Sequence, residues 1–298
     1  MKKLNEQELN QVLKEHEKWL KGEGGACANL DGVDLSGVDL SDENLAKANL
    51  SNTWLIGADL SFSNLEEATL DNAIIEKANL SGANLSGASL VYVAFQESML
   101  VNANLFQADL RKADFKLAKL MEACLVNTNL AEAVLTSADL QGASLRGADL
   151  DGAYLNEANL TNVILDRANL RGADLCSAKL DGVDYSCTTA FFALQCPEVG
   201  SFTAFKKADD KIIELEVPAS AKRSSATTRK CRCDKAKVVS ITSPDGKTSY
   251  LEAESNVDPK FIYRVGEMME VPDFDEDRWN ECSAGIHFFP TRQEAVNY

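Results

Sequence analysis

A large apolar residue recurs at every fifth position of this chain, from Leu30 to Tyr185, without interruption. Leucine fills 28 of these 32 positions. The four exceptions are Ile75, Phe95, Phe115 and Tyr185. The residue two places earlier is small, alanine in 22 cases, and Glu43 is the one charged residue at this position. A strict repeat of this length must be explained before any other feature of the sequence.

A period of five fits neither the 3.6 residues of a helix nor the two of a simple strand. It fits a chain that turns a corner after every fifth residue, so that four sides bring residue n close to residue n+20. Small and large residues two places apart then point to the same side of each extended segment and fill the interior. Every glycine between residues 26 and 187 stands two places after a large residue. This position is predicted to be the second central residue of a type II turn, where φ is positive.

Segments such as Ala78–Gly82 (Ala-Asn-Leu-Ser-Gly) and Ala148–Gly152 (Ala-Asp-Leu-Asp-Gly) resemble the pentapeptide-repeat family. The resemblance implies a right-handed quadrilateral β-helix. Four repeats per coil predict eight coils, with a length of roughly 38 Å at about 4.8 Å per stacked strand. The expected fold is mainly β: this β-helix over 26–187, an N-terminal capping α-helix within 1–25, and a small α+β domain over 188–298.

Stacking at a spacing of 20 residues sorts the large residues into four columns. One column contains Leu55, Ile75, Phe95, Phe115 and Leu135, so the two phenylalanine rings are expected to pack against each other in the core. Another column contains four asparagines outside the core, where a hydrogen-bonded side-chain ladder is expected. These are Asn44, Asn64, Asn84 and Asn104.

The N-terminal segment, residues 5–21, is predicted to form one amphipathic helix. Asn5 and Glu8 match a capping box, and Gly22 marks the end of the helix. An open β-helix end exposes apolar side chains and unpaired backbone groups. The helix is therefore expected to cover the first coil, with His16 buried in a structural role.

The repeat stops after Cys187, and all six prolines lie beyond it. Phe191, Phe192 and Leu194 are expected to plug the open end. Short strands are predicted at 211–217, 237–242, 248–253, 261–265 and 286–289, with a hairpin turn at 243–246 and a last helix over 291–298. With its segments Cys196–Glu198, Lys222–Arg232 and Gly285–Phe289, this tail resembles an uncharacterised domain appended to bacterial and phage pentapeptide-repeat proteins, which implies no known activity.

The outward positions of the repeats are polar in the end coils and become apolar in the middle. Stacking places Val101 over Met121 and Phe106 over Val126, with Met99 nearby. Contiguous exposed apolar surface usually marks an interface. These five residues are therefore the candidate interface, which either a protein partner, a second copy of the chain or the C-terminal domain would cover. A second outward column contains Trp54, Ile74 and Ala94.

The formal net charge is −16, and residues 26–187 contribute −13 of it, from 10 basic and 23 acidic residues. An acidic surface disfavours direct nucleic-acid and membrane binding. The eight cysteines have no disulfide-framework spacing, no apolar signal core precedes the repeats, and no apolar run reaches membrane-spanning length. These features predict a cytoplasmic protein with reduced thiols.

The C-terminal domain contains residue types that suit a zinc site, although one residue instead of two separates its first pair. These residues are Cys231, Cys233, Cys282 and His287. Structural thiols are the preferred interpretation, and no metal or cofactor is expected. The basic segment Lys222–Arg232 is interpreted as a flexible charged loop, with anion binding as the alternative.

No catalytic Ser/His/Asp group and no phosphate-binding glycine loop is present in the sequence, so the chain is not expected to be an enzyme. The preferred function is a scaffold that binds a protein. The alternative is an acidic DNA mimic that inhibits or protects a type II topoisomerase (DNA gyrase), as the family resemblance implies. Such mimics typically dimerise through their C-terminal coil, whereas here a further domain follows.

Overall fold

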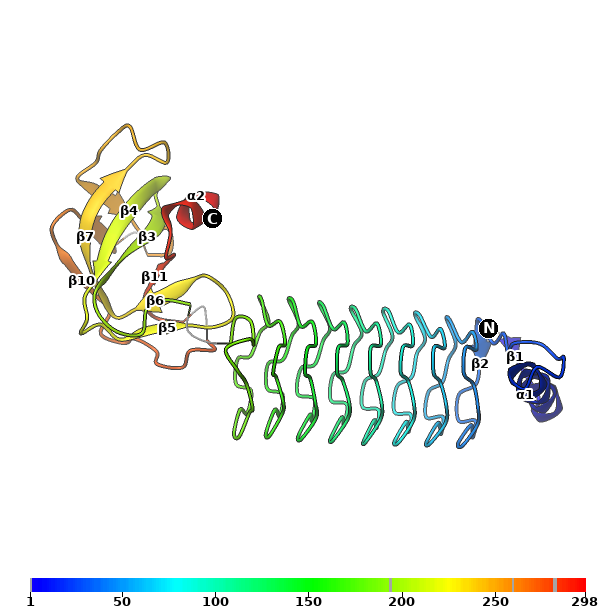
Figure 1. Ribbon diagram of the computed structural model, residues 1–298. Coiled ribbons are helices and arrows are strands. Elements are labelled where there is room, and N and C mark those ends of the chain that lie inside the picture. Colours follow the sequence, from blue (N-terminus) through cyan, green and yellow to red (C-terminus); the bar gives the residue numbers. More distant parts are fainter. Residues whose placement is uncertain (1, 193–194, 259, 281–282) are drawn as a thin grey trace. The chain divides into compact units, whose positions relative to one another are not determined.

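A computed structural model describes residues 2–192, 195–258, 260–280 and 283–298 (Figure 1). Leu194, which was expected to help plug the open end, and Cys282, one of the zinc candidates, lie outside these ranges. The chain forms two compact units, residues 1–190 and residues 191–298. None of the described helices has both the length and the apolar character needed to cross a membrane.

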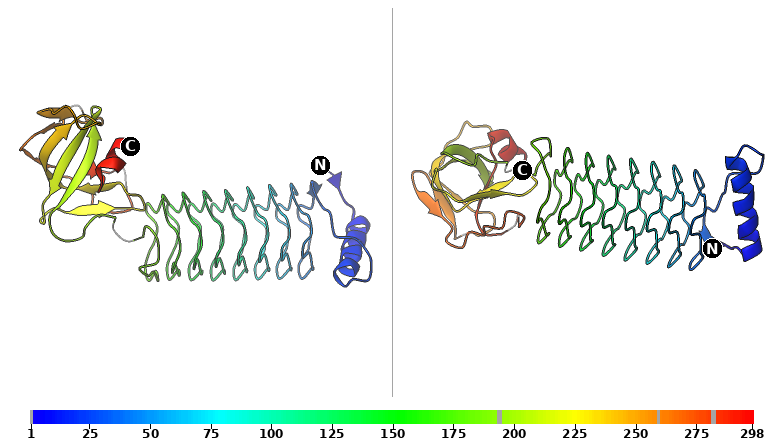
Figure 2. Two further views of the ribbon diagram at one scale, coloured as in Figure 1. Left: turned by 45° about the horizontal axis from the view of Figure 1, so that its top comes forward. Right: turned by 60° about the horizontal axis from the view of Figure 1, so that its bottom comes forward.

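The first unit is a stack of coils, seen from three directions in Figures 1 and 2. Parallel β-bridges join residues 20 apart, from Asn29 with Asn49 to Ile164 with Asp184, as the five-residue period predicts. The Leu30 amide donates to the Asn49 carbonyl oxygen over 2.7 Å, and the Asn49 amide donates to the Ala28 carbonyl oxygen over 2.9 Å. The same pair of bonds recurs along the stack, so each coil is the template for the next.

The corners of the coils have the predicted backbone conformation. From Gly32 to Gly182, the residue two places after each large residue has positive φ, whether or not it is glycine. At the first corner the Val33 amide donates to the Leu30 carbonyl oxygen over 3.1 Å, which closes the turn. Bulky residues such as Leu117 (φ 62°) adopt this conformation at a cost of about 1–2 kcal/mol each. The hydrogen bonds to both neighbouring coils offset that cost.

The interior of the coils is filled by the large residues and by the small residues two places before them. The leucines at the repeated large position, from Leu30 to Leu170, are at most 1% exposed. Thr53 and Ser63 replace alanine without leaving a buried hydroxyl unpaired, because each donates to the carbonyl oxygen of the preceding leucine, over 2.6 and 2.7 Å. A small hydroxyl residue is therefore compatible with this position.

The asparagine ladder is confirmed. Asn64, Asn84 and Asn104 each donate through Nδ2 to Oδ1 of the asparagine one coil earlier, over 3.0 Å in all three cases. The side chains form a hydrogen-bonded column on the outer side of four successive coils.

The N-terminus adds a strand and a helix to the first coil. β1 (Lys2–Lys3) pairs in parallel with β2 (Val33–Asp34). α1 (Glu6–Leu20) begins with the predicted capping box between Asn5 and Glu8. His16 is fully buried, and its Nδ1 accepts a hydrogen bond from the Ala28 amide over 3.0 Å.

The second unit contains three small sheets and one helix. A four-stranded sheet has the order β10-β7-β4-β3, with β10 Met268–Glu270, β7 Lys235–Thr242, β4 Lys211–Val217 and β3 Phe202–Ala208. A three-stranded sheet has the order β11-β6-β5, with β11 Ile286–Phe288, β6 Cys231–Cys233 and β5 Arg223–Ser225. β8 (Glu252–Glu254) pairs with β9 (Ile262–Arg264), and α2 (Arg292–Asn297) follows β11.

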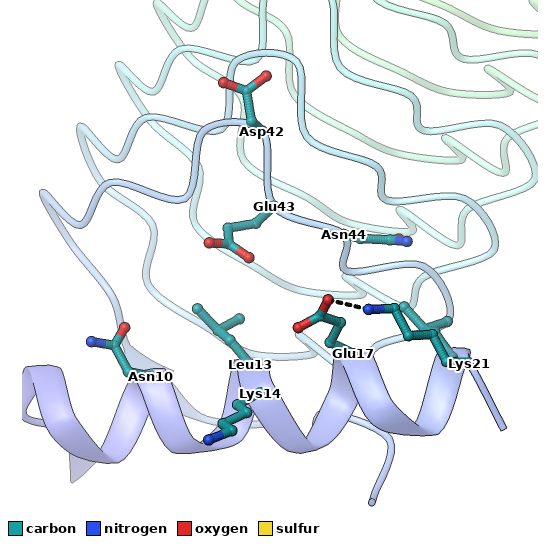
Figure 3. Close-up of a pocket in the computed structure, with 9 residues that line it drawn as sticks. Asn10, Leu13, Lys14, Glu17, Lys21, Asp42, Glu43 and Asn44 are labelled. Carbon is teal, nitrogen blue, oxygen red and sulfur yellow. Dashed lines mark hydrogen bonds and ion pairs between the residues drawn. The ribbon is translucent and has the colours of Figure 1, made fainter. Parts of the chain in front are cut away.

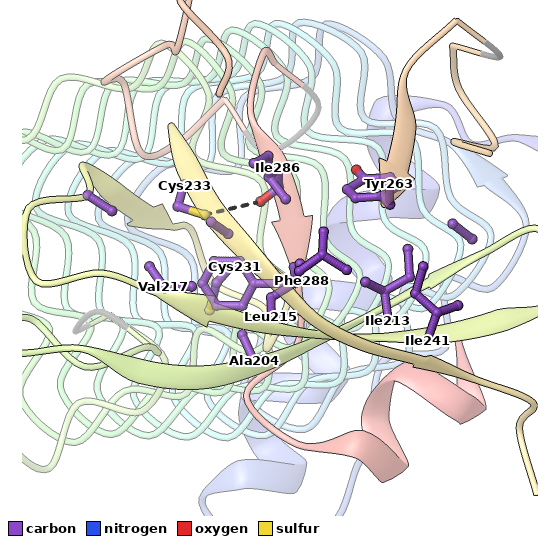
Figure 4. Packing of buried hydrophobic residues seen from close by; sticks show 14 of the residues in the cluster. Ala204, Ile213, Leu215, Val217, Cys231, Cys233, Ile241, Tyr263, Ile286 and Phe288 are labelled. Carbon is purple, nitrogen blue, oxygen red and sulfur yellow. Dashed lines mark hydrogen bonds between the residues drawn. The ribbon is translucent and has the colours of Figure 1, made fainter. Parts of the chain in front are cut away.

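Side chains from these sheets share one apolar core, shown in Figure 4. Leu215 from β4, Cys233 from β6 and Phe288 from β11 are fully buried in it. The hairpin turn at 243–246 is present, because the Gly246 amide donates to the Ser243 carbonyl oxygen over 2.8 Å. The strand predicted at 248–253 begins only at Glu252.

Candidate protein-binding surface

The parallel ladder aligns the outward side chains of the first unit in columns. Met99, for example, bridges Asn79 in the coil before it and Lys119 in the coil after it. The Met99 amide donates to the Ala78 carbonyl oxygen over 2.9 Å, which keeps the two coils in register. Alternate residues of an extended segment face opposite sides, so Met99 points outward while Leu100 fills the interior.

Five apolar side chains gather in the middle coils, and we call them the central patch: Met99, Val101, Phe106, Met121 and Val126. Met99 and Phe106 are 42% and 38% exposed, and the other three are half-buried. Polar residues flank the patch at the same positions of neighbouring coils. They are Ser81 and Gln141 in the column of Val101 and Met121, and Ser86 and Arg146 in the column of Phe106 and Val126.

The coils that carry the central patch are also electrically neutral. Residues 88–127 contain four acidic and four basic residues, whereas residues 26–87 carry a net charge of −8 and residues 128–187 a net charge of −5. Arg111 pairs with Asp109 over 2.7 Å, and Lys112 pairs with Glu132 in the next coil over 3.5 Å. The apolar patch therefore coincides with a break in the acidic surface.

Phe62 is a further exposed apolar side chain, at a corner before the central patch, and the sequence analysis did not single it out. Its side chain is 68% exposed, and its ring covers Gly82, where an added Cβ would lie 2.7 Å from the ring. Gly82 is the corner residue one coil before Asn102, next to Val101. The available sequence signal is its place two residues after Leu60, the position that glycine takes in other repeats, and its φ of 58° agrees with a corner.

A second apolar column lies on another side of the coils. Trp54 bridges Ile74, and Ile74 bridges Ala94. Trp54 is 41% exposed, and nearby in sequence Ile56 is 37% exposed. Asp34 precedes this column and Asp114 follows it, so it is bounded by charge at both ends.

The core column that the sequence predicts lies in the interior of the coils, beneath their outward side chains. Leu55, Ile75, Phe95, Phe115 and Leu135 are all fully buried. The rings of Phe95 and Phe115 are stacked, with centroids 4.8 Å apart and planes inclined by 9°. These rings hold the interior of the same coils that display the central patch.

A polar cavity of about 600 Å³ lies between α1 and the first coils (Figure 3). Leu13 and Glu17 point into it from α1, and Asp42 and Glu43 line its opposite wall. Burial raises the pKa of Glu43, and the nearby carboxylates of Glu17 and Asp39 raise it further. Glu43 occupies a position that a small residue fills in all the remaining repeats.

The three zinc candidates that the structure describes, Cys231, Cys233 and His287, do not converge on one point. β6 pairs with β11 so that Cys231 lies opposite Phe288, Cys233 opposite Ile286, and Arg232 opposite His287. Because side chains alternate along a strand, the two thiols face the apolar core while His287 faces the other side. Among the described residues, no three His, Cys, Asp or Glu side chains are placed to hold a metal ion.

The basic segment Lys222–Arg232 is not the flexible loop that the sequence suggested, because it forms β5 and β6. Its arginines bind backbone carbonyl groups. Arg223 donates to the carbonyl oxygens of Pro197 and Gly200 over 2.9 and 3.0 Å. Arg232 is 2% exposed, donates to carbonyl oxygens of the 275–284 segment and stacks on Phe274. These residues stabilise loops within the second unit.

Family models match both units. A family described as "Pentapeptide repeat region" matches residues 28–105. The description "Pentapeptide repeats (8 copies)" applies to matches at residues 88–125, 98–136, 114–152 and 153–184. A "Family of unknown function (DUF5758)" matches residues 192–295. No curated protein matches the chain in sequence.

Solved structures also match the chain. HetL, a pentapeptide repeat protein involved in heterocyst differentiation regulation in the cyanobacterium Nostoc sp. strain PCC 7120, is 26% identical over 61% of this chain and 94% of HetL, with a TM-score of 0.41. QnrB1, a plasmid-mediated fluoroquinolone resistance protein, is 18% identical over 54% of this chain and 84% of its own, with a TM-score of 0.42. Rfr23 from the cyanobacterium Cyanothece 51142 is 26% identical over 60% of this chain and 97% of its own, with a TM-score of 0.24.

Proposed function

Because the chain belongs to the pentapeptide-repeat family and continues into a domain of a family of unknown function, we propose that it is a non-enzymatic scaffold that binds a protein partner through the central patch. The observation that carries the proposal is the coincidence of apolar outward side chains with electrically neutral coils. Interfaces are depleted of charge at their centre and enriched in aromatic residues and methionine.

The interior of the coils does not require these apolar side chains. The core positions of the same coils are already filled by Leu100, Leu105 and Leu120, which are fully buried. Serine, glutamine and arginine occupy the flanking positions of the same columns. An outward methionine or phenylalanine is therefore better explained by contact with another molecule than by packing within the coil.

The proposed partner is a different protein that binds transiently. The central patch spans two coils, or roughly 10 Å along the stack, and so offers only a few hundred Å² of apolar surface. A stable homodimer usually buries about 800 Å² or more from each subunit and has a more apolar interface. A small apolar centre within a polar rim suits a transient complex instead. The partner's surface would present an apolar group to Met99 and Phe106.

The charge distribution disfavours the DNA-mimic alternative. A segment of B-DNA about 38 Å long carries roughly 22 phosphate charges, evenly spaced. Residues 26–187 carry a net charge of −13, and the central 40 residues carry none of it. A gyrase supercoiling assay with titrated protein tests this alternative directly, and inhibition that survives disruption of the central patch would favour it.

The proposal includes eight coils, with α1 as a cap over the first of them, and a cytoplasmic location. The contact between His16 and the Ala28 amide, together with the pairing of β1 with β2, supports the cap. Bridges at 20-residue spacing along the repeats support the coil number.

The decisive experiment replaces Val101→Glu together with Phe106→Lys in the full chain and captures partners from the source cell. The matched control is Gln141→Glu with Arg146→Lys, which places the same two side chains in the same two columns beyond the patch. We expect the wild-type and control proteins to retain a common captured partner and the patch variant to lose it, with unchanged circular dichroism. Identical capture by all three proteins contradicts the proposal. Loss of self-association in sedimentation would replace the partner with a second copy of the chain.

A further inference from the structure

The second unit contains a cavity of about 720 Å³ that the proposed scaffold function does not use. This volume lies within the range of small-molecule sites. The aromatic side chains of Phe261 and Tyr263 form one part of its lining, and their rings meet edge to face with centroids 5.2 Å apart. Lys206 from β3 and Lys230, which precedes β6, also line the cavity.

The two lysines have no carboxylate partner among the residues that the structure describes. The Lys206 Nζ donates to the His287 carbonyl oxygen over 3.3 Å and lies 5.7 Å from the centroid of the Tyr263 ring. The Lys230 Nζ donates to the Tyr298 hydroxyl over 3.3 Å. Both ammonium groups therefore have dipolar and aromatic neighbours in place of a counter-charge.

The electrostatics of Lys206 agree with this geometry. Burial, together with the positive charge of Lys230, lowers the pKa of Lys206 to about 8. Three carboxylates, those of Asp258, Glu270 and Asp273, belong to the exposed part of the lining, and none of them acts on this pKa. A charged group in a desolvated site is costly when it lacks a partner, so a bound anion would stabilise the ammonium form.

We propose that this cavity binds a small organic anion, whose phosphate or carboxylate group lies between Lys206 and Lys230 and whose apolar part packs against Phe261 and Tyr263. Lysine is a common phosphate ligand because its ammonium acts as a compact point charge with three donors. Burial raises the pKa of the Tyr263 hydroxyl, so this group stays a neutral phenol beside the anion. The exposed carboxylates at the rim restrict the ligand to one anionic group of modest size.

The experiment uses pyridoxal 5′-phosphate as a probe on the full-length protein at pH 7.5. Its aldehyde condenses with a neutral lysine amine to an imine and releases water, and borohydride then supplies the hydride that reduces the imine. Peptide mass spectrometry measures the labelling of each lysine. We expect Lys206 to be labelled at least tenfold faster than the exposed Lys247, which is the internal control.

Competition identifies the anionic group. Phenyl phosphate and benzoate are added separately, and phenol serves as the neutral control with the same ring. We expect at least one of the two anions to reduce the labelling of Lys206 fivefold or more while labelling of Lys247 stays unchanged and phenol has no effect. The anion that protects distinguishes a phosphate site from a carboxylate site. Absence of protection by both anions, or labelling of Lys206 no faster than Lys247, overturns the proposal.

A direct binding measurement gives a second readout. Lys206→Met keeps the length of the side chain and removes its charge, and Lys247→Met is the matched control. Calorimetric titration with the protecting anion is expected to show at least tenfold weaker binding to Lys206→Met and unchanged binding to Lys247→Met. Because the variant removes an uncompensated charge, its Tm is expected to equal or exceed that of the wild type. Unchanged affinity in a folded Lys206→Met variant also overturns the proposal.

Discussion

Replacement of Phe95 with alanine tests how much the stacked phenylalanine rings of the core contribute to the free energy of unfolding. Phe95 is fully buried, and its ring stacks on that of Phe115 with centroids 4.8 Å apart. Truncation of a buried phenylalanine costs about 3–5 kcal/mol, depending on how far the surroundings collapse. Here collapse is limited, because hydrogen bonds of 2.7–3.2 Å fix the backbone spacing between adjacent coils. We therefore expect a cost of about 4–5 kcal/mol.

Part of this cost comes from the ring pair itself. Stacked aromatic pairs contribute about 0.5–1.5 kcal/mol beyond the burial of their area. A double-mutant cycle with Phe95→Ala and Phe115→Ala should return a coupling energy of this size. Phe95→Leu, which introduces the residue that most other repeats have at this position, should cost only about 1–1.5 kcal/mol.

Urea unfolding followed by far-ultraviolet circular dichroism measures these energies. Stacked repeats can lose cooperativity, so the denaturant slopes of the wild type and variants must agree before their midpoints are compared. The control is Phe62→Ala, which removes a ring that is 68% exposed and should change stability by less than about 0.5 kcal/mol. A cost below about 1 kcal/mol for Phe95→Ala would refute the assignment of this column to the core.

Three further predictions concern the N-terminal end. Deletion of residues 1–22 removes α1 and β1 and should promote end-to-end association, because the first coil loses its cover; light scattering that finds the truncated protein monodisperse excludes the capping role. Burial lowers the pKa of His16 below its ordinary value of 6.5, so the unfolded chain binds the proton more tightly and stability should fall as the pH drops below about 6.5; a His16→Gln variant with the same acid sensitivity would disprove this assignment. The raised pKa of Glu43 has the opposite effect on stability. The ionised carboxylate destabilises the folded protein at neutral pH, and this cost disappears as the pH falls through the folded-state pKa of Glu43. Glu43→Ala should therefore increase the stability at pH 7 by about 0.5–1 kcal/mol in thermal unfolding, and equal or lower stability contradicts this reasoning.

The coil region follows from the sequence to the level of single residues. A residue pattern with a period of five determines which side chains face inward, and glycine at one position of the repeat indicates the corner that every repeat shares. The asparagine ladder follows from the same arithmetic. Such predictions succeed because each contact in a solenoid joins residues at one constant separation, so local sequence contains all of the topology.

The conformation of the non-glycine corners was harder to anticipate. Leu117 and Phe62 adopt positive φ against their own preference, because hydrogen bonds to two neighbouring coils leave no alternative backbone path. The position of Phe62 over Gly82 depends on that conformation. Local propensity alone would not place an exposed phenylalanine at a corner.

The second unit shows what only the tertiary structure decides. The residues of the basic segment look like a solvated loop in sequence, yet Arg223 and Arg232 are held by carbonyl groups from segments up to 52 residues away. The cavity around Lys206 likewise combines residues from β3, β9 and β11 that have no common spacing. The same pairing of β6 with β11 turns Cys231 and Cys233 away from His287. Where contacts join residues at unrelated separations, the pairing of strands determines which side chains meet, and no period in the sequence records it.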